Sequence, residues 1–182
     1  MKEISLNILD ITENSVKAGA SLTEIYLNEM ADKLVLTIKD DGCGMDEQTV
    51  KSVIDPFYTT RKTRKVGLGI PLLKLACEQT GGSLSITSSI DATDHGTTVE
   101  AVFFTNHIDF TPLGDVISSI VTLIQGHPST DFLFRHKMDR GTVELDTREL
   151  RIVLEDVPLD TYEVILWIRE NLAEQYEAIN FN

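Results

Sequence analysis

The stretch that decides the fold is Ile38-Lys39-Asp40-Asp41-Gly42-Cys43-Gly44-Met45. Leu34, Leu36 and Ile38 recur at every second position, which predicts a strand with one apolar face. Asp40 falls on the apolar parity, so its carboxylate points inward and requires a hydrogen-bond donor from the protein or from a ligand. Gly42 and Gly44 let the backbone turn and let another molecule come close. An ordinary strand-ending turn with solvated carboxylates is the alternative.

Length and composition describe a soluble globular protein. The chain has 182 residues, of which 42% are hydrophobic and 25% charged, enough for one sizeable domain or one domain with a small appendage. The net charge of −13 argues against nucleic acid as a partner, because phosphates would be repelled. No apolar run reaches about 18 residues and no signal peptide is evident, so we expect a cytoplasmic protein without a membrane partner. Two cysteines without metal spacing fit reduced thiols.

The charge is unevenly spread along the chain. Residues 108–182 carry 14 acidic and 6 basic side chains, whereas four of the ten basic residues in 1–107 lie within Arg61-Lys62-Thr63-Arg64-Lys65. A basic cluster in an acidic protein is either a solvated loop or a site for an anionic ligand.

A helix is predicted from Ile4 to Ala18, with a polar stripe opposite its apolar side. Asp10, Asn14 and Lys17 lie at i, i+4 and i+7, so they share one face, with Glu13 beside them. This face is either a solvated surface or one aimed at a metal-phosphate group, with an amide oxygen for the cation and an ammonium group for the anion.

The remaining pattern up to residue 106 alternates hairpins and helices, which predicts a mixed α+β layer with helices on one face of an antiparallel-rich sheet. Gly67-Leu68-Gly69 opens one of these helices just after the basic cluster. The free N–H groups and positive dipole end of such a helix favour an anion, so a phosphate site is predicted there. The expected elements are strands Leu22–Met30, Leu34–Asp40, 84–86 and Thr98–Phe104, a short helix capped by Asp46, and a helix Leu68–Thr80 with Leu72, Leu73, Leu75 and Ala76 on its buried side.

Taken together in this order, the motifs of residues 4–105 resemble the GHKL ATPase superfamily of gyrase, chaperone, histidine-kinase and mismatch-repair ATPases. The resemblance implies a Bergerat-type two-layer α/β sandwich that binds ATP with Mg²⁺. It rests on residues 13–20 as the N box, residues 40–45 as the first glycine box, Pro56-Phe57-Tyr58-Thr59-Thr60 with Gly67-Leu68-Gly69 as the F box, lid and second glycine box, and Gly96-Thr97 as the last glycine motif.

The resemblance also implies a role for individual residues. Asn14 would hold Mg²⁺ against the triphosphate, Asp40 would accept a hydrogen bond from the adenine amino group, and Lys17 would lie near phosphate. Arg61 and Lys62 would reach the β- and γ-phosphates from the lid. The full set implied for ATP binding is Asn14, Lys17, Ala18, Asp40, Gly42, Gly44, Met45, Thr60, Arg61, Lys62, Gly67, Leu68, Gly69 and Thr97, with Asp10 and Lys17 as catalytic residues.

Two departures from the family pattern bear on activity. ATP-hydrolysing members have a general-base glutamate one turn before the N-box asparagine, where this chain has the shorter Asp10, so hydrolysis could be slow or absent. The lid is short and has Lys65 where the family has a glycine. The chain also begins near the N box, without a phosphoacceptor-histidine segment, so we expect a stand-alone domain similar to anti-sigma-factor kinases.

Residues 107–182 form the second expected unit, a small acidic α+β domain after the ATP-binding domain of residues 1–106. It is predicted to contain a helix from Pro112 to Gln125, a hairpin within 131–145 and helices Thr147–Leu154 and Asp160–Ala178, the last with Trp167 in its core stripe. No catalytic constellation is evident there, so partner binding is the hypothesis.

The sequence thus predicts a signalling protein that binds Mg-ATP and acts as an ATPase or as a kinase for a partner protein. The alternative is a non-catalytic nucleotide sensor, in which ATP orders the lid and changes partner binding.

Overall fold

Helices and hairpins alternate in the computed structural model, which describes residues 3–54 and 68–180. Its first half follows the helix and hairpins expected from the sequence. In chain order the elements are α1 (Ile4–Lys17), β1 (Leu22–Met30), β2 (Lys33–Asp40), α2 (Glu47–Val53), α3 (Gly69–Gln79), β3 (Ser83–Ser89), β4 (Gly96–Phe104), α4 (Val116–Gly126), β5 (Asp131–Met138), β6 (Gly141–Asp146), α5 (Thr147–Leu154) and α6 (Tyr162–Asn180).

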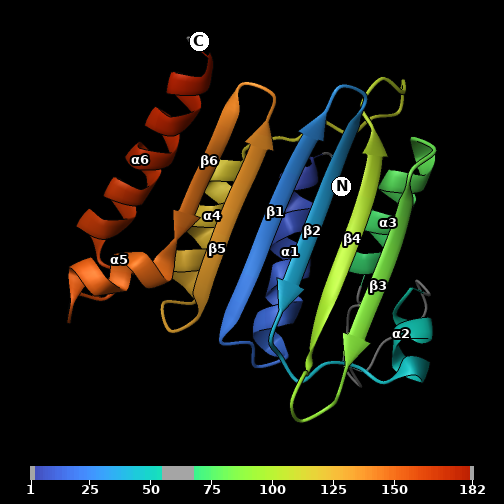
Figure 1. The fold of residues 1–182 in the computed structure, drawn as a ribbon, viewed down its shortest axis with the longest axis horizontal. Helices are drawn as coiled ribbons and strands as arrows, with labels where there is room; N and C mark the ends of the chain where they lie inside the picture. The colour runs from blue at the N-terminus through green and yellow to red at the C-terminus, as the bar shows by residue number, and fades with distance from the viewer. Residues whose placement is uncertain (1–2, 55–67, 181–182) are drawn as a thin grey trace.

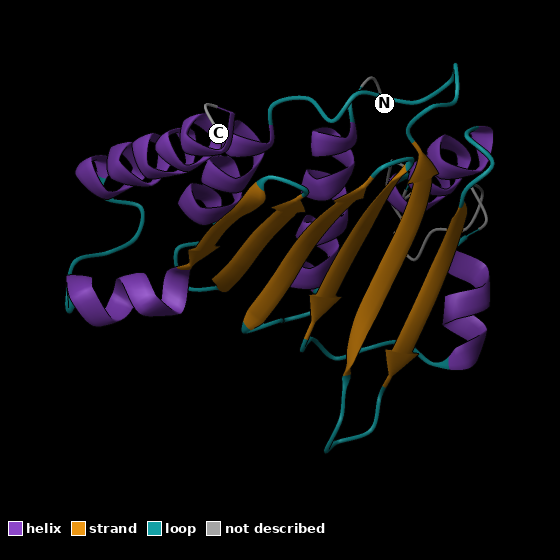
Figure 2. Cartoon of the chain, turned by 45° about the horizontal axis from the view of Figure 1, so that its top comes forward, coloured by secondary structure: helices purple, strands orange, loops and turns teal. Residues whose placement is uncertain are grey.

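The six strands form one sheet in the order β3-β4-β2-β1-β5-β6 (Figure 1). β5 pairs in parallel with β1, and the other neighbouring pairs are antiparallel. The longer helices lie on one face of the sheet, as Figure 2 shows. The predicted α+β class and two-layer α/β sandwich are therefore confirmed.

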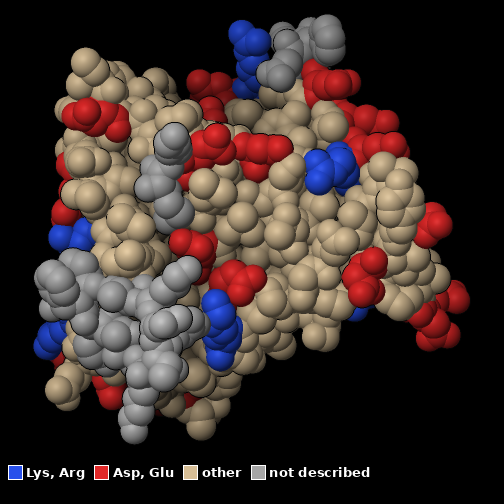
Figure 3. All heavy atoms as spheres, turned by 180° about the vertical axis from the view of Figure 1, so that it is seen from behind, with Lys and Arg blue, Asp and Glu red and all other residues tan. Residues whose placement is uncertain are grey.

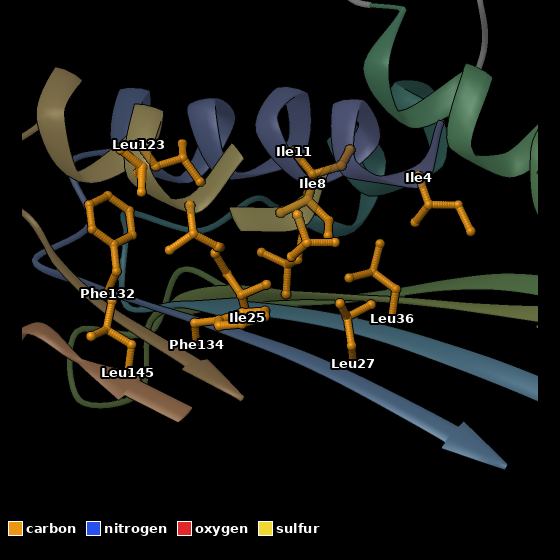
Figure 4. Packing of buried hydrophobic residues seen from close by; sticks show 14 of the residues in the cluster. Ile4, Ile8, Ile11, Ile25, Leu27, Leu36, Leu123, Phe132, Phe134 and Leu145 are labelled. Atoms are coloured by element: carbon orange, nitrogen blue, oxygen red, sulfur yellow. The ribbon is translucent and has the colours of Figure 1, made fainter. Parts of the chain in front are cut away.

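The alternation of buried and exposed side chains along the strands explains why the helices cover one face of the sheet. Burial alternates along residues 22–27 of β1 and along β2, and the buried apolar side chains of these strands belong to the same hydrophobic cluster as the apolar face of α1. Ile4, Ile8 and Ile11 of α1 recur one turn apart and are at most 2% exposed. Figure 4 shows them above the strand residues, with Leu123 of α4 and Phe132 of β5 continuing the same layer. The core thus places α1 at the centre of the molecule.

Residues 107–182 extend this sheet instead of building a second one. The parallel register aligns Ile25 of β1 with Phe134 of β5, and buried residues of α4, β5, β6 and α6 belong to the same hydrophobic cluster as those of α1 and β1. The division at residue 106 therefore separates neither two sheets nor two cores. The partner-binding role of residues 107–182 stays a prediction.

Two expected core residues lie at the surface. Leu75 of α3 is 52% exposed, because the buried side of this helix is formed by Leu73 and Cys77, one turn apart. Trp167 of α6 is 48% exposed, although its neighbours Val164 and Ile168 are buried. Both errors arise because an apolar residue was assigned to a core stripe without knowing which side of the helix meets the sheet.

The end of α5 contains a strained residue. Glu155 has φ 52° and ψ −109°, a backbone conformation that glycine adopts without steric cost. Glu155→Gly is expected to raise the free energy of unfolding by about 0.5–1 kcal/mol, because relief of the left-handed strain exceeds the added freedom of the unfolded chain. Urea unfolding measures this change.

Glu155→Ala is the matched control, since it removes the same charge but keeps a Cβ. It should leave the unfolding midpoint where it is in the wild type. Equal stabilisation by both variants would mean that charge, and not backbone strain, is responsible.

Candidate functional site: the glycine motifs at the end of the central strands

The buried carboxylate of Asp40 lies at the end of β2 and is satisfied by the protein itself. The Ser15 hydroxyl donates to Asp40 Oδ2 at 2.7 Å, and the Gly42 backbone N–H donates to Oδ1 at 3.0 Å. Asp40 is 8% exposed, and a carboxylate has about four lone-pair sites, so two donors leave capacity for a ligand. The inward orientation predicted from strand parity is confirmed.

The following carboxylate, Asp41, anchors the loop to a neighbouring turn. It accepts hydrogen bonds from the backbone N–H groups of Ser21 at 2.8 Å and Leu22 at 2.9 Å, and from the Ser21 hydroxyl. Burial by itself would raise the pKa of Asp41, but these hydrogen bonds outweigh it and lower the pKa. Asp41 is therefore a structural carboxylate, and Asp40 is the carboxylate turned toward the candidate site. We call this site, formed by Asp40, the N-box helix and the glycine motifs, the cradle.

The first glycine loop is held against two other segments. A Cβ on Gly42 would lie 2.9 Å from the Cβ of Ala18, where the Cys43 N–H donates to the Ala18 carbonyl at 2.9 Å. Gly44 has φ 69°, and a Cβ there would lie 1.8 Å from the Ser89 carbonyl oxygen. Close packing within the chain thus requires both glycines, whether or not a ligand also approaches them.

The last glycine motif meets the first across the sheet. Thr97 is aligned with Asp40 in the β2–β4 register, and a Cβ on Gly96 would lie 2.1 Å from the Asp40 carbonyl oxygen. Ser88 joins the two motifs, because its hydroxyl oxygen lies 2.8 Å from the Met45 nitrogen and 2.8 Å from Thr97 Oγ1. The structure thus brings Met45 and Thr97 to one side of Asp40.

The second glycine motif lies against the polar side of α1. A Cβ on Gly69 would lie 3.3 Å from Asp10 Cβ and 3.9 Å from Asn14 Nδ2. Gly69 begins α3, preceded by the 44%-exposed Leu68, so the free N–H groups of this helix end begin beside Asp10 and Asn14. The polar stripe of α1 therefore faces a helix N-terminus and is not merely a solvated surface.

Lys17 belongs to a small charged cluster at the end of α1. Its Nζ lies 3.3 Å from Glu13 Oε2, and the other Glu13 oxygen lies 2.7 Å from His127 Nε2. His127 follows α4, so the C-terminal part of the chain contacts the N-box helix directly. The remaining expected ligands, Thr60, Arg61, Lys62 and Gly67, lie outside the described residues.

The donors available for Mg²⁺ are few. Within residues 3–54 and 68–180, no group of three His, Cys, Asp or Glu side chains could hold a metal ion. The Asn14 amide is exposed beside the glycine cradle at the start of α3, and Mg²⁺ commonly takes one or two protein ligands together with substrate phosphates. The arrangement therefore fits a cation that arrives with a nucleotide.

Two cavities flank the sheet at opposite ends. One of about 370 Å³ is lined by Ala18, Gly42, Cys43 and His95, beside the motif residues. The other, of about 530 Å³, lies between the Met30 and Asp139 turns and contains none of them. The first cavity therefore adjoins the first glycine loop, and the second lies away from the motifs.

Sequence reasoning missed Ser15, Ser88, His95 and His127. The His95 Nδ1 atom lies 2.7 Å from the Gly42 carbonyl oxygen, although 53 residues separate them along the chain. Ser15 adjoins Asn14 in the N box, which is the only signal that the sequence offers. The other three are ordinary polar residues until the sheet register brings them to the loop.

The Glu13–His127 contact yields a titration test. The His127 hydrogen bond, with a smaller contribution from Lys17, lowers the pKa of Glu13 below 4.5. A depressed carboxylate pKa stabilises the fold above about pH 4.5 and loses that contribution as pH falls through the folded pKa. His127→Ala should raise the pKa of Glu13 toward 4.5 and weaken the pH dependence of the melting temperature below that pH, as carboxyl NMR titration and thermal melts can measure.

The control for this test is His107→Ala, because His107 is exposed and lies 3.7 Å from Asp109, away from Glu13. The prediction fails if the pKa of Glu13 is the same in both variants.

Comparison with known proteins finds relatives among bacterial kinases. Over 111 residues the chain is 32% identical to the sensor histidine kinase YxdK of Bacillus subtilis, covering 57% of this chain and 33% of that protein. It is 31% identical over 88 residues to sporulation kinase C of the same organism, covering 48% and 20%. The chain thus spans a third or less of these relatives. The crystal structure of the N-terminal domain of a DNA repair protein shares the fold, with a TM-score of 0.59 and 14% identity over 80% of this chain and 52% of that one.

No helix among the described residues is both long and apolar enough to cross a membrane. Residues 2–109, more than half of the chain, match the model of the histidine kinase-, DNA gyrase B- and HSP90-like ATPases. The chain therefore belongs to this family and carries its ATP-binding domain.

Proposed function

We propose that the protein binds Mg-ATP in the cradle around Asp40 and transfers the terminal phosphoryl group to a partner protein, with hydrolysis slow. The observation that carries this proposal is that the N-box helix meets the first and second glycine motifs, while the last glycine motif pairs with the first across the sheet. Asp40 is held by Ser15, Thr97 is aligned with Asp40, and Gly69 lies against Asp10 and Asn14.

Each group then has a distinct role. The free lone pairs of Asp40 accept the adenine amino hydrogen bond, and the N–H groups at the start of α3 bind phosphate oxygens. Asn14 holds Mg²⁺, whose charge offsets that of the phosphates. Lys17, fixed by Glu13, contributes a further cation near the transferred group, since phosphoryl transfer depends mainly on positioning and charge stabilisation.

The carboxylates near the phosphate end argue for slow hydrolysis. Glu13 is bound to both His127 and Lys17, so it is not free to accept a proton from water. Asp10 is exposed and makes no side-chain hydrogen bond or ion pair within residues 3–54 and 68–180, but its side chain is one methylene shorter than glutamate. A general base must reach its proton before its pKa matters.

The second candidate is a nucleotide sensor without catalysis. The Glu13–His127 contact favours it, because it links the N-box helix to residues 107–182, where a partner would bind. ATP binding would then be read out through this contact or through the lid.

Asp40→Asn tests nucleotide binding. The substitution replaces an acceptor of the adenine amino group by an amide, and hydrogen bonds to charged groups contribute about 1.5–3 kcal/mol. Affinity for Mg-ATP should therefore fall roughly 10- to 100-fold, as measured by calorimetry. Asp109→Asn, at an exposed site in the loop after β4, is the matched control. If Asp40→Asn binds Mg-ATP as tightly as the wild type does, Asp40 does not bind the adenine.

Asn14→Ala tests the metal and the chemistry together. Phosphate release from Mg-ATP should be slow in the wild type and should fall to background in the variant. Any release that remains should depend on Mg²⁺ concentration at least tenfold less than in the wild type. Asn106→Ala, an exposed asparagine in a turn distant from the site, serves as the control. Release that persists unchanged in Asn14→Ala would contradict the assigned metal ligand.

Asp10→Ala separates the candidate activities. It should abolish hydrolysis, slow phosphoryl transfer to a protein only modestly, and leave a pure sensor unaffected, because only hydrolysis requires a base for water. Radiolabelled ATP reports both reactions, and calorimetry checks that nucleotide binding is retained. Rapid hydrolysis in this variant would exclude Asp10 as the base.

A further inference from the structure

One corner of the molecule, formed by α5 and the start of α6, exposes an unusual number of large apolar side chains. Figure 1 places both elements beyond β6, at the opposite end of the sheet from α2 and α3. We call these side chains the α5–α6 apolar surface. They are Ile152 (79% exposed), Val153 (81%), Val157, Tyr162 (74%), Leu166 and Trp167.

The first two turns of α6 are apolar on two opposite sides. Val164, Ile168 and Leu172 recur one turn apart and are buried in the core. Tyr162 and Leu166 also lie one turn apart, and helical geometry puts them on the side opposite Val164. A surface helix needs a single apolar stripe, and one that is apolar on both sides is normally covered on both.

The helix α5 repeats this pattern. Leu150 and Leu154 pack against the core, whereas Ile152 and Val153 point away from it and are almost fully exposed. Packing within the chain therefore uses one side of each helix and leaves the other side to solvent. Several large apolar side chains exposed on neighbouring elements mark a candidate interaction site in a soluble protein.

The surroundings of this surface are strongly acidic. Figure 3, seen from behind, shows acidic groups along the edge that α5 and α6 occupy. The cations there are already engaged: Arg148 with Asp146 at 2.6 Å, Arg151 with Asp131 at 2.7 Å, and Arg169 with the Ser118 hydroxyl at 3.1 Å. No ion pair is present, among the described residues, for the acidic side chains of this segment, which are Glu149, Glu155, Asp156, Asp160, Glu163, Glu170, Glu174 and Glu177.

We propose that the α5–α6 apolar surface docks a segment of a partner protein that presents apolar side chains flanked by lysine and arginine, such as a basic amphipathic helix. The apolar centre supplies burial, and the uncompensated carboxylates select for positive charge at the rim. A second copy of this chain would bring the same carboxylates face to face. Their repulsion disfavours self-association through this face. The inference deepens the proposed recognition of a partner by residues 107–182 and does not depend on nucleotide binding.

The chain contains its own reporter for this test. Trp167 is the single tryptophan, it belongs to the α5–α6 apolar surface, and it is 48% exposed. The probe is a synthetic amphipathic helix of leucine and lysine, roughly 18 residues long so that it is helical. Binding should shift the Trp167 emission to the blue as water is excluded, and added salt should weaken binding. The matched probe replaces each lysine by glutamate and should not bind.

The variant Ile152→Ser/Tyr162→Ser tests whether the probe binds this surface. Both side chains are more than 70% exposed, so the fold should be retained, and affinity for the lysine probe should fall at least tenfold. Ile108→Ser, at a 95%-exposed isoleucine after β4, is the control and should bind as the wild type does.

Three results would overturn the proposal: equal binding of the two probes, unchanged affinity in the double variant, or a wild-type dimer in sedimentation that the double variant abolishes. Mg-ATP affinity of the double variant should equal that of the wild type. If the wild-type protein binds the lysine probe but does not bind ATP, only the nucleotide proposal is refuted.

Discussion

The buried carboxylate of Asp40 is the constraint on which the site depends. A charge at the end of an apolar strand is tolerated only where donors reach it, and the donors come from two places. The Ser15 hydroxyl arrives from α1 and the Gly42 N–H from the loop that follows the strand. Satisfying this one group therefore fixes how the N-box helix sits on the sheet and how the first glycine loop turns.

Close backbone packing then brings the other motifs to the same place. Gly96 lies against the Asp40 carbonyl and Gly44 against that of Ser89, at distances which no side chain could occupy. Gly44 and Gly96 are thus required for the local fold before any ligand binds. Gly69 packs less tightly, since a Cβ there would lie 3.3 Å from Asp10 Cβ where α3 begins against α1.

The central position of α1 gives the C-terminal part a direct connection to the site. One side of α1 packs into the shared core, its polar side faces the start of α3, and Glu13 at its end meets His127 beyond α4. Residues 107–182 and the proposed nucleotide site consequently contact the same helix. Because β5 is paired with β1, the two parts of the chain are also joined through the sheet itself.

Local pattern by itself determined most of the secondary structure and the inward direction of Asp40, because strand alternation, helical spacing and the Asp46 cap are properties of neighbouring residues. The family resemblance of the ordered motifs, and not local pattern, predicted that Asp10, Asn14, Gly69 and Thr97 are parts of one site. Only the tertiary structure decided that Ser15, Ser88, His95 and His127 belong beside them, since their partners lie 9 to 114 residues away along the chain. It also decided that residues 107–182 share the sheet and that Trp167 faces solvent, because periodicity identifies an apolar side chain but not the surface that it meets.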